Sequence, residues 1–283
     1  MPNHKLYDEI FSRNIGVISR EEQERLKRGR VTVVGAGGVG GIALILLARM
    51  GVGQLHVIDP DVFEASNLNR QMLSTLSRLH KSKAESARET LKDINPEISV
   101  RITKQFIAED NAKELLQDTD VIIDATDHLV TRLIIHRTAA QIGIPSVWIA
   151  VTPPFRGAVM SFTPKSVPYE IVLRHPSYKQ PLTDEMKEKI NAIKDGRALH
   201  SVQHGADKNW ANAYVNRESP WAVIAPAANI VGLLASFESF KFLLQRKDLK
   251  PVIGPDLIRV NLASRQMVEV QTPTEGSWDN TLL

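Results

Sequence analysis

The sequence predicts an α/β protein built on a doubly wound, mostly parallel sheet that C-terminal antiparallel strands extend. Short apolar segments alternate with helix-like segments from residue 31 to residue 151, and this alternation is typical of a parallel sheet with helices on both faces. Two further strand-like segments, 257–262 and 266–270, lie close enough in sequence to form a hairpin.

The elements are expected in the following order. A Ser-x-x-Glu capping box at Ser19 begins a helix that ends near residue 28. Strands are predicted at 31–34, 55–59, 98–102, 121–124, 146–151 and 158–162, and helices at 38–50, 83–93, 111–117, 129–141, 183–194 and 226–245. No Gly/Ser linker divides the chain. We therefore expect one domain, 1–283, with a helical arm (1–30), a core (31–163), an irregular insertion (164–221) and a closing part (222–283).

Composition excludes several classes of protein. The formal net charge is only +3 and cations are scattered among 32 acidic residues, so no nucleic-acid partner is expected. No apolar run reaches the roughly 18 residues of a membrane span, and the N-terminus lacks the apolar core of a signal peptide. A cytoplasmic protein without membrane contact is expected. The chain contains 0 cysteines, which excludes disulfides, thiolate zinc sites and a catalytic thiol.

A glycine-rich loop follows the first predicted strand. Gly35, Gly37 and Gly40 satisfy G-x-G-x-x-G, with Gly38 inside the motif. Glycines let backbone N–H groups approach a phosphate, and the following helix contributes its positive N-terminal dipole. Asp59 ends the next strand, where a carboxylate can bind ribose hydroxyls. This pattern predicts a Rossmann-like nucleotide-binding core, and alone it is most typical of nicotinamide or flavin enzymes.

The segment after Asp59 favours a triphosphate. Asn67, Arg70 and Gln71 follow within a polar loop, and Lys83 comes soon after. A pyrophosphate is satisfied by a glycine loop, whereas a triphosphate needs Arg and Lys to offset its additional charge. The alternative interpretation is a solvated polar loop, which would not require these side chains in this order.

These motifs together resemble the ubiquitin-activating-enzyme superfamily, and most closely its bacterial ThiF/MoeB/HesA family of adenylyltransferases. The resemblance covers about residues 7–163 and recurs in the long helix near 226–245. It rests on the loop 35–41, on Asp59 followed by Ser66-Asn67-Leu68-Asn69-Arg70-Gln71, on Lys83-Ala84-Glu85-Ser86, on Asn95-Pro96 and on Asp124-Ala125-Thr126-Asp127.

The resemblance implies roles for individual residues. Those expected at the nucleotide are Gly35, Gly37, Gly38, Gly40, Asp59, Asp61 and Gln71. Among them, Gly37 and Gly40 approach the nucleotide, Asp59 holds the ribose, and Gln71 supports the phosphate-binding loop.

The resemblance also implies which residues act on the reacting phosphates. Asn67, Arg70 and Lys83 stabilise the triphosphate, and Asp127 positions a magnesium ion. Arg13, in Phe11-Ser12-Arg13-Asn14, reaches the ATP of the other subunit. The expected cofactors are therefore ATP and Mg²⁺, and the expected assembly is a homodimer.

The implied reaction is ATP-dependent adenylation of a carboxylate on a small carrier protein or a peptide. The carboxylate would belong to the tail of a ubiquitin-like sulfur carrier or to a ribosomally made peptide. The chain departs from the family in four respects: it lacks the paired-cysteine zinc motifs and the cysteine of the segment 164–221, and it has His128 and His80 where Asn and Gly are usual. Without cysteine, this chain forms no thioester.

Two other functions stay open at this point. A nicotinamide-dependent oxidoreductase would explain the glycines and Asp59 but leaves Arg13, Arg70 and Lys83 without a role. A non-catalytic nucleotide-binding scaffold subunit would usually have lost the triphosphate cations.

Several residues outside these motifs allow two interpretations. His200 and His204 could bind a metal or belong to a polar loop, and the charge run 184–194 could be a solvated helix or could guide a charged tail. Arg156 could meet a substrate carboxylate or pack at a strand end. Trp221 could be an interface or a lid residue. The insertion 164–221 is expected to lie over the site.

Overall fold

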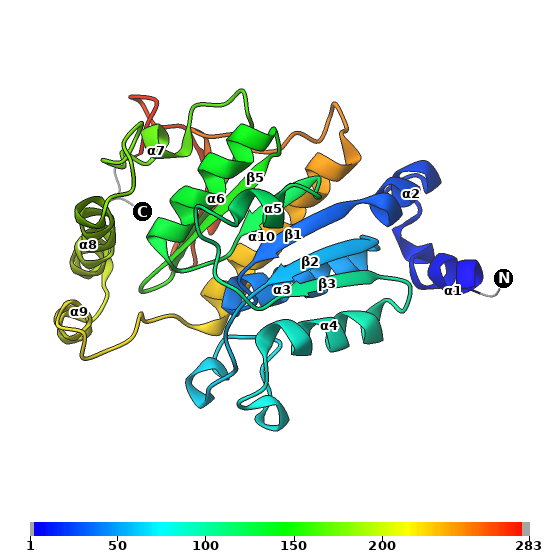
Figure 1. The fold of residues 1–283 in the computed structure, drawn as a ribbon, viewed down its shortest axis with the longest axis horizontal. Coiled ribbons are helices and arrows are strands. Elements are labelled where there is room, and N and C mark those ends of the chain that lie inside the picture. The colour runs from blue at the N-terminus through cyan, green and yellow to red at the C-terminus, as the bar shows by residue number, and fades with distance from the viewer. Residues whose placement is uncertain (1–2, 279–283) are drawn as a thin grey trace.

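The computed structural model describes residues 3–278 and is built around one eight-stranded sheet (Figure 1). The strand order is β3-β2-β1-β4-β5-β6-β7-β8. The five strands from β3 to β5 are parallel, and β6, β7 and β8 continue the sheet in antiparallel pairing. The strands span β1 Arg30–Val34, β2 Gln54–Ile58, β3 Ser99–Thr103, β4 Val121–Asp124, β5 Ser146–Thr152, β6 Arg156–Phe162, β7 Leu257–Asn261 and β8 Val268–Gln271. The predicted fold class is confirmed.

Helices cover both faces of the sheet and bury two separate apolar cores. The α-helices span α1 Asn3–Ile10, α2 Arg20–Arg28, α3 Gly38–Met50, α4 Lys83–Ile94, α5 Ala112–Leu116, α6 Leu129–Ile142, α7 Tyr169–Val172, α8 Asp184–Ser201, α9 Lys208–Val215 and α10 Ala225–Leu244. Side chains of α3, α4 and α10 share one core with the sheet, and those of α5, α6 and α8 share the other. The strands β1, β2, β4, β5 and β6 are buried on both faces along most of their length, which explains their mostly apolar sequences, whereas the edge strands β3 and β8 are not.

The helix α10 is long and apolar enough to cross a membrane by length and composition. It lies instead against α3 and the strands β4, β5 and β6 (Figure 1). Its buried side chains include Val231, Ala235 and Leu244. A helix that is apolar on most sides is expected where it packs between a sheet and another helix.

The largest difference from the predicted elements lies in the insertion 164–221. This segment is largely helical: α7 and α9 were not predicted, and α8 continues past residue 194 to Ser201. Gly196 obscured the continuation, but Arg197, Ala198 and Ser201 are buried on this part of the helix, and packing overrides the low propensity of glycine. The Asp207 side chain caps α9 by accepting hydrogen bonds from the Asn209 and Trp210 backbone N–H groups.

The N-terminal arm packs at the amino ends of β1 and β2. The predicted capping box is present: Ser19 accepts from the Glu22 N–H at 3.1 Å, and Glu22 accepts from the Ser19 N–H at 2.7 Å. Tyr7 of α1 is buried and donates to the Gly51 carbonyl at 2.6 Å. These contacts fix the arm, and with it the short 3-10 helix Ser12–Asn14 that carries Arg13.

Candidate nucleotide and substrate site

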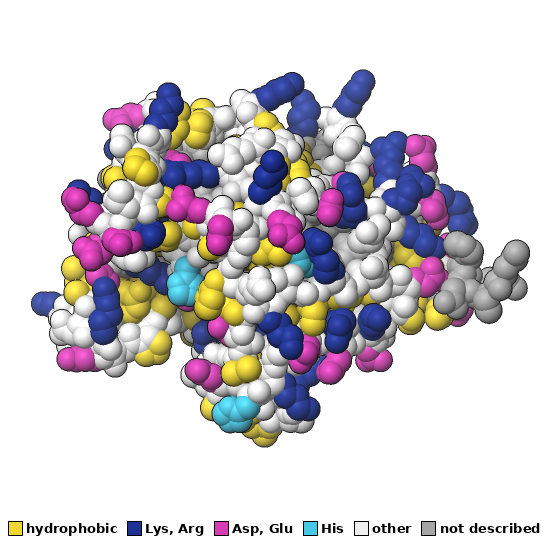
Figure 2. All heavy atoms as spheres, viewed as in Figure 1, with side chains coloured by type: hydrophobic (Ala, Val, Ile, Leu, Met, Phe, Trp, Pro, Cys, Tyr) yellow, Lys and Arg dark blue, Asp and Glu magenta, His cyan; other side chains and the backbone are white. Residues whose placement is uncertain are grey.

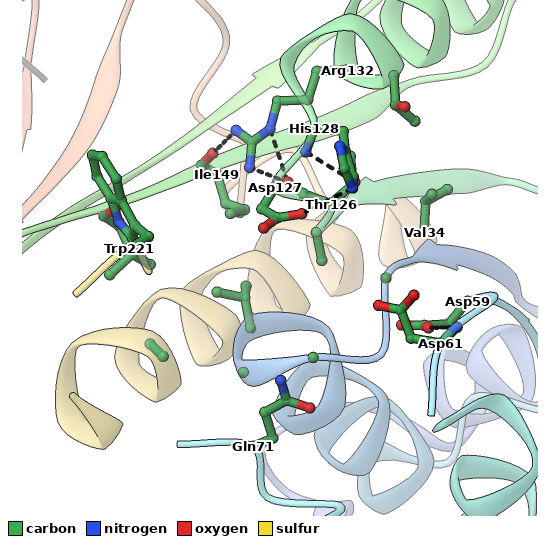
Figure 3. A pocket seen from close by; sticks show the side chains of 18 of the residues that line it. Val34, Asp59, Asp61, Gln71, Thr126, Asp127, His128, Arg132, Ile149 and Trp221 are labelled. Carbon is green, nitrogen blue, oxygen red and sulfur yellow. Dashed lines mark hydrogen bonds and ion pairs between the residues drawn. The ribbon is translucent and has the colours of Figure 1, made fainter. Parts of the chain in front are cut away.

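A cavity of about 650 Å³ lies at the carboxyl ends of β1, β2, β4 and β5. Its wall brings together segments far apart in sequence: the glycine loop and the loops after β2 and β4 (Figure 3). Lys194 and Arg197 of α8 also line it. In Figure 2 the surface is hollowed between the region of α8 and α9 and the loop that follows β2. Ligands of open parallel sheets bind at this edge, where the connections diverge.

The glycine loop is shaped by backbone contacts that only glycine permits. Gly35 has φ +96°, and a Cβ there would lie 2.7 Å from the Ala125 carbonyl oxygen. Gly37 precedes α3, and Gly38 begins it. Both line the cavity together with Gly35. The positive end of α3 therefore faces the cavity, as phosphate binding requires.

Gly40 has a different role from the one expected. It is buried and is not among the residues that line the cavity. A Cβ at this position would lie 1.8 Å from the Gly35 carbonyl oxygen and 3.1 Å from the Ala125 Cβ. Gly40 thus permits the close packing of α3 against the loop rather than an approach to the nucleotide itself.

Asp59 is buried at the end of β2 and organises the loops around it. One carboxylate oxygen accepts from the Ala36 N–H at 2.7 Å and the other from the Asp61 N–H at 2.8 Å. Burial raises the pKa of Asp59, while the hydrogen bond from Ala36 and the charge of Lys83 oppose the rise. Asp59 lines the cavity, so its position is compatible with ribose binding.

Asn67, Arg70 and Gln71 lie on the opposite wall of the same cavity. Asn67 is fixed by accepting from the Glu64 N–H at 3.1 Å. The Arg70 Nη1 donates to the Ser66 carbonyl at 2.9 Å. Burial lowers the pKa of Arg70, and attraction by Asp127 across the cavity opposes this shift.

Gln71 is placed as its predicted role requires. A Cβ on Gly37 would lie 3.6 Å from the Gln71 amide nitrogen, so the side chain packs directly against the glycine loop (Figure 3). Its Oε1 is buried without a hydrogen-bond partner among the described residues. A polar group of this kind is available to a ligand or to a water molecule.

Lys83 and Asp61 form an ion pair at the mouth of the cavity. The Lys83 Nζ lies 3.0 Å from Asp61 Oδ2, and the lysine side chain is only 10% exposed whereas that of Asp61 is 57% exposed. Lys83 is the first residue of α4, whose Ser82 cap accepts from the Glu85 N–H. A cation is thereby held against the cavity near the glycine loop.

Asp127 projects into the cavity from the loop after β4 (Figure 3). Its side chain is 81% exposed, and its Oδ2 lies 3.9 Å from Lys194 Nζ. Desolvation would raise the pKa of Asp127, but the charges of Lys194, His128 and Arg132 together hold it below its usual value. The carboxylate therefore stays ionised.

Three further cations line this cavity: Arg132, Lys194 and Arg197. Lys194 ends the charge run 184–194 that could guide a charged tail, whereas Arg132 and Arg197 were not predicted as site residues. Arg132 lies one helical turn beyond Asp127, and its guanidinium donates to the backbone carbonyls of Thr126 and Ile149 (Figure 3). Lys194 and Arg197 belong to α8 of the insertion. Trp221, which also lines the cavity, belongs to the connection that follows α9. The segment expected to lie over the site thus forms one of its walls.

Arg13 lies outside the cavity of its own chain. It is exposed on the 3-10 helix Ser12–Asn14, and Leu6, Ile10 and Val17, which are close to it in sequence, are exposed apolar residues. The single chain therefore leaves the expected role of Arg13 as a prediction.

The oxygen ligands at the cavity suit magnesium better than a metal ion that is coordinated only by protein side chains. Among residues 3–278 no group of three or more His, Cys, Asp or Glu side chains is placed to hold a metal ion. Asp127 offers a single ionised carboxylate with most of its surface open. Magnesium is usually held by one or two carboxylates together with substrate phosphates and water, and Asp127 suits that arrangement.

Several curated proteins that are similar in sequence to part of this chain are named adenylyltransferases. A probable adenylyltransferase/sulfurtransferase MoeZ of Mycobacterium tuberculosis is 43% identical over 126 residues, which cover 44% of this chain and 32% of MoeZ. A sulfur carrier protein adenylyltransferase of Thermus thermophilus is 39% identical over 145 residues, 51% of this chain and 53% of that protein. The matches thus span less than two thirds of each relative.

Structure and family comparison cover nearly the whole chain. The microcin C7 biosynthetic enzyme MccB, solved in complex with N-formylated MccA, superimposes with a TM-score of 0.71 at 19% identity, over 98% of this chain and 75% of MccB. At this identity the likeness establishes a shared fold. The model of the ThiF family matches residues 11–277, which include the glycine loop, the cations and Asp127, and the chain belongs to the ThiF family.

Proposed function

We propose that this chain is an ATP-dependent adenylyltransferase that activates a carboxylate on a small carrier protein or a peptide. The observation that carries the proposal is the convergence of the α3 N-terminus, Arg70 and Lys83 on one cavity with Asp127. A pyrophosphate-binding dinucleotide enzyme does not need these cations, whereas a triphosphate under attack does. The adenylyltransferase names of its sequence relatives support the same reaction.

In the proposed reaction a substrate carboxylate oxygen attacks the α-phosphorus of ATP. A new P–O bond forms, the bond from the α-phosphorus to the bridging oxygen of the β-phosphate breaks, and pyrophosphate leaves with the electron pair. The product is an acyl-adenylate. Arg70, Lys83 and the N-terminus of α3 neutralise and align the phosphates, so positioning and electrostatics supply the rate acceleration. No side chain acts as a covalent nucleophile, consistent with 0 cysteines.

Magnesium, held by Asp127 and the ATP phosphates, would supply charge neutralisation on the leaving pyrophosphate. Asp127 is kept anionic by Lys194, His128 and Arg132, so it needs no deprotonation before binding a cation. The acyl group would pass to a nucleophile from outside this chain or from the substrate itself. We also propose that the enzyme acts in the cytoplasm.

We further propose that the active form is a homodimer in which Arg13 completes the partner's site. Arg13 is exposed, and so are the apolar side chains of Leu6, Ile10 and Val17 in the same N-terminal segment, a composition suited to an interface. A complementation experiment tests this: Arg13→Ala and Lys83→Ala are each inactive alone. Mixing them restores part of the activity if Arg13 acts across the interface, and restores none if it acts within its own chain.

The main test is ATP–pyrophosphate exchange with purified protein, Mg²⁺ and candidate carriers or peptides. Arg70→Ala is the test variant, and Arg88→Ala, an exposed arginine on α4, is the matched control. Substrate-dependent exchange that falls by about 10²–10³ in Arg70→Ala and persists in Arg88→Ala is the expected result.

Two negative results differ in meaning. ATP binding without exchange would indicate that the substrate is not among the candidates tested. Absence of both ATP binding and exchange would contradict the proposal and favour the oxidoreductase or the non-catalytic scaffold.

A further inference from the structure

A row of basic side chains runs along α8, away from the cavity. Lys194, Arg197, His200 and His204 recur at intervals of three or four residues, a spacing that places them on one face of a helix; a 3-10 turn, Val202–His204, continues α8 at its end. Lys194 and Arg197 line the cavity. The row therefore starts beside Asp127 and continues beyond the nucleotide site.

Two arginines of the sheet act electrostatically on the far end of this row. Desolvation lowers the pKa of His204, and the charges of Arg156, His200 and Arg259 lower it further. Arg156 begins β6 opposite Thr152 of β5, which lines the cavity. Arg259 on β7 pairs with Ala158, two residues beyond Arg156, so both arginines project from the same face of the sheet.

Arg156 lacks the partner that a buried guanidinium requires. The side chain is only 6% exposed, and its Nε and Nη2 are buried without a hydrogen-bond partner among the described residues. Burial, reinforced by the charge of Arg259, lowers the pKa of Arg156 to about 10. Arg259 forms an ion pair with Glu269 at 3.0 Å, whereas within residues 3–278 no acid is paired with Arg156.

A buried unpaired cation destabilises a fold. The surrounding groups, Arg259 and His204, are themselves cationic or able to become so. An anion that entered this cluster would satisfy the guanidinium and offset the mutual repulsion. The fold therefore presents a preorganised anion site one strand beyond the cavity wall at Thr152.

We propose that Arg156, with Arg259 and His204, binds an acidic side chain of the substrate's C-terminal segment while the terminal carboxylate reaches Lys194 beside the nucleotide. This inference rests on the proposed adenylation of a peptide or protein tail. The path along α8 from Lys194 to His204 rises about 15 Å at about 1.5 Å per residue. An extended tail advances about 3.3 Å per residue. The acidic residue is thus expected about four to five residues before the C-terminus.

The test uses synthetic ten-residue peptides that end in Gly-Gly within a neutral Ser/Ala background. A single Asp is moved from the third to the eighth position from the C-terminus, and each peptide has an Asn counterpart of the same shape. Isothermal titration calorimetry measures binding to the full chain. Wild type should bind the peptide with Asp at the fifth or sixth position from the C-terminus about 10-fold more tightly than its Asn counterpart, the worth of one charge-assisted hydrogen bond.

Three variants identify the site. Arg156→Met should abolish the preference for Asp over Asn while its melting temperature stays equal to or rises above that of wild type, because an unpaired buried cation is removed. Arg259→Gln should reduce the preference for Asp, and it replaces Arg156→Met as the test variant if Arg156→Met does not fold. Arg88→Gln, at the far edge of the sheet on α4, should retain it.

The outcomes separate this inference from the proposed function. The inference is overturned if wild type binds the Asp and Asn peptides equally, or binds neither, at every position. It is also overturned if the preference for Asp survives in Arg156→Met. Pyrophosphate exchange measured on the same samples reports adenylation independently. Exchange without an Asp preference overturns only this inference. An Asp preference in a protein that shows neither ATP binding nor exchange supports the anion site while it contradicts the proposed function.

Discussion

Substitution of Gly40 by alanine should disrupt the nucleotide loop although Gly40 does not face the cavity. The added Cβ would lie 1.8 Å from the Gly35 carbonyl oxygen. The clash is with a backbone atom, and Gly35 has little room to move because it packs closely against the Ala125 carbonyl. The loop must therefore move by more than an ångström, and overpacking of this kind costs about 1–3 kcal/mol.

The expected consequence is a loss of both stability and nucleotide binding. For a chain of this size about 1–3 kcal/mol corresponds to a fall in melting temperature of roughly 2–10 °C, measured by circular dichroism, and ATP affinity measured by calorimetry should fall in parallel. Gly196→Ala is the matched control, because nothing lies within 4 Å of its added Cβ and the helix interior favours alanine by about 0.5–1 kcal/mol. An unchanged melting temperature and ATP affinity in Gly40→Ala would refute the packing argument.

Three further substitutions test single features of the structure. Lys83→Met should lower kcat/KM by about 10²–10³ in the exchange assay, whereas the exposed neighbour variant Lys81→Met should not; equal losses would contradict the cavity role. His80 has φ +64°, so His80→Gly should leave stability unchanged or raise it by up to about 1 kcal/mol in chemical denaturation, and a clear loss would contradict the strain. Burial lowers the pKa of His175 to about 3, below its value in the unfolded chain. As pH falls from about 6.5 towards 3, the unfolded chain binds a proton that the folded protein does not, so the free energy of unfolding decreases by up to about 1.4 kcal/mol per pH unit. His175→Phe should flatten that part of the pH–stability profile, and an unaltered profile would show that another group causes it.

The sheet and its helices were predictable because the signals are local. The alternation of apolar and helix-like segments predicted the five parallel strands. The observed bounds of β4, Val121–Asp124, are those expected. Glycine spacing also predicted the α3 N-terminus. His80 illustrates a second kind of local signal: a glycine is usual there in the family, and the observed left-handed backbone gives the physical reason.

The parts that were not predictable depend on tertiary packing. Arg132 and Arg197 appear in sequence as ordinary helix residues, and only the packing of α6 and α8 brings them to the cavity. Gly40 satisfies a nucleotide-binding pattern, yet its effect is exerted through contact with Gly35. A sequence motif specifies the residue type at a position, but two different constraints, ligand approach and close packing, both require glycine.

The pair Lys194–Asp127 shows how magnitudes distinguish a structural contact from a functional one. The separation of 3.9 Å is long for an ion pair, and Asp127 is 81% exposed, so solvent screening limits its contribution to stability to less than about 1 kcal/mol. Burial nevertheless lowers the pKa of Lys194, and the charges of Arg132 and Arg197 act in the same direction. A half-buried ammonium with so weak an internal partner is available to a ligand anion.

A double-mutant cycle with Lys194→Met and Asp127→Asn tests this argument. On the free energy of unfolding, the coupling between the two substitutions should stay below about 1 kcal/mol, because the pair contributes little to the fold. On substrate-dependent pyrophosphate exchange, each substitution alone should already abolish most activity, so their effects should be strongly non-additive, as for residues that act as one unit. Strong coupling in unfolding together with additive effects on exchange would instead assign Lys194 a structural role.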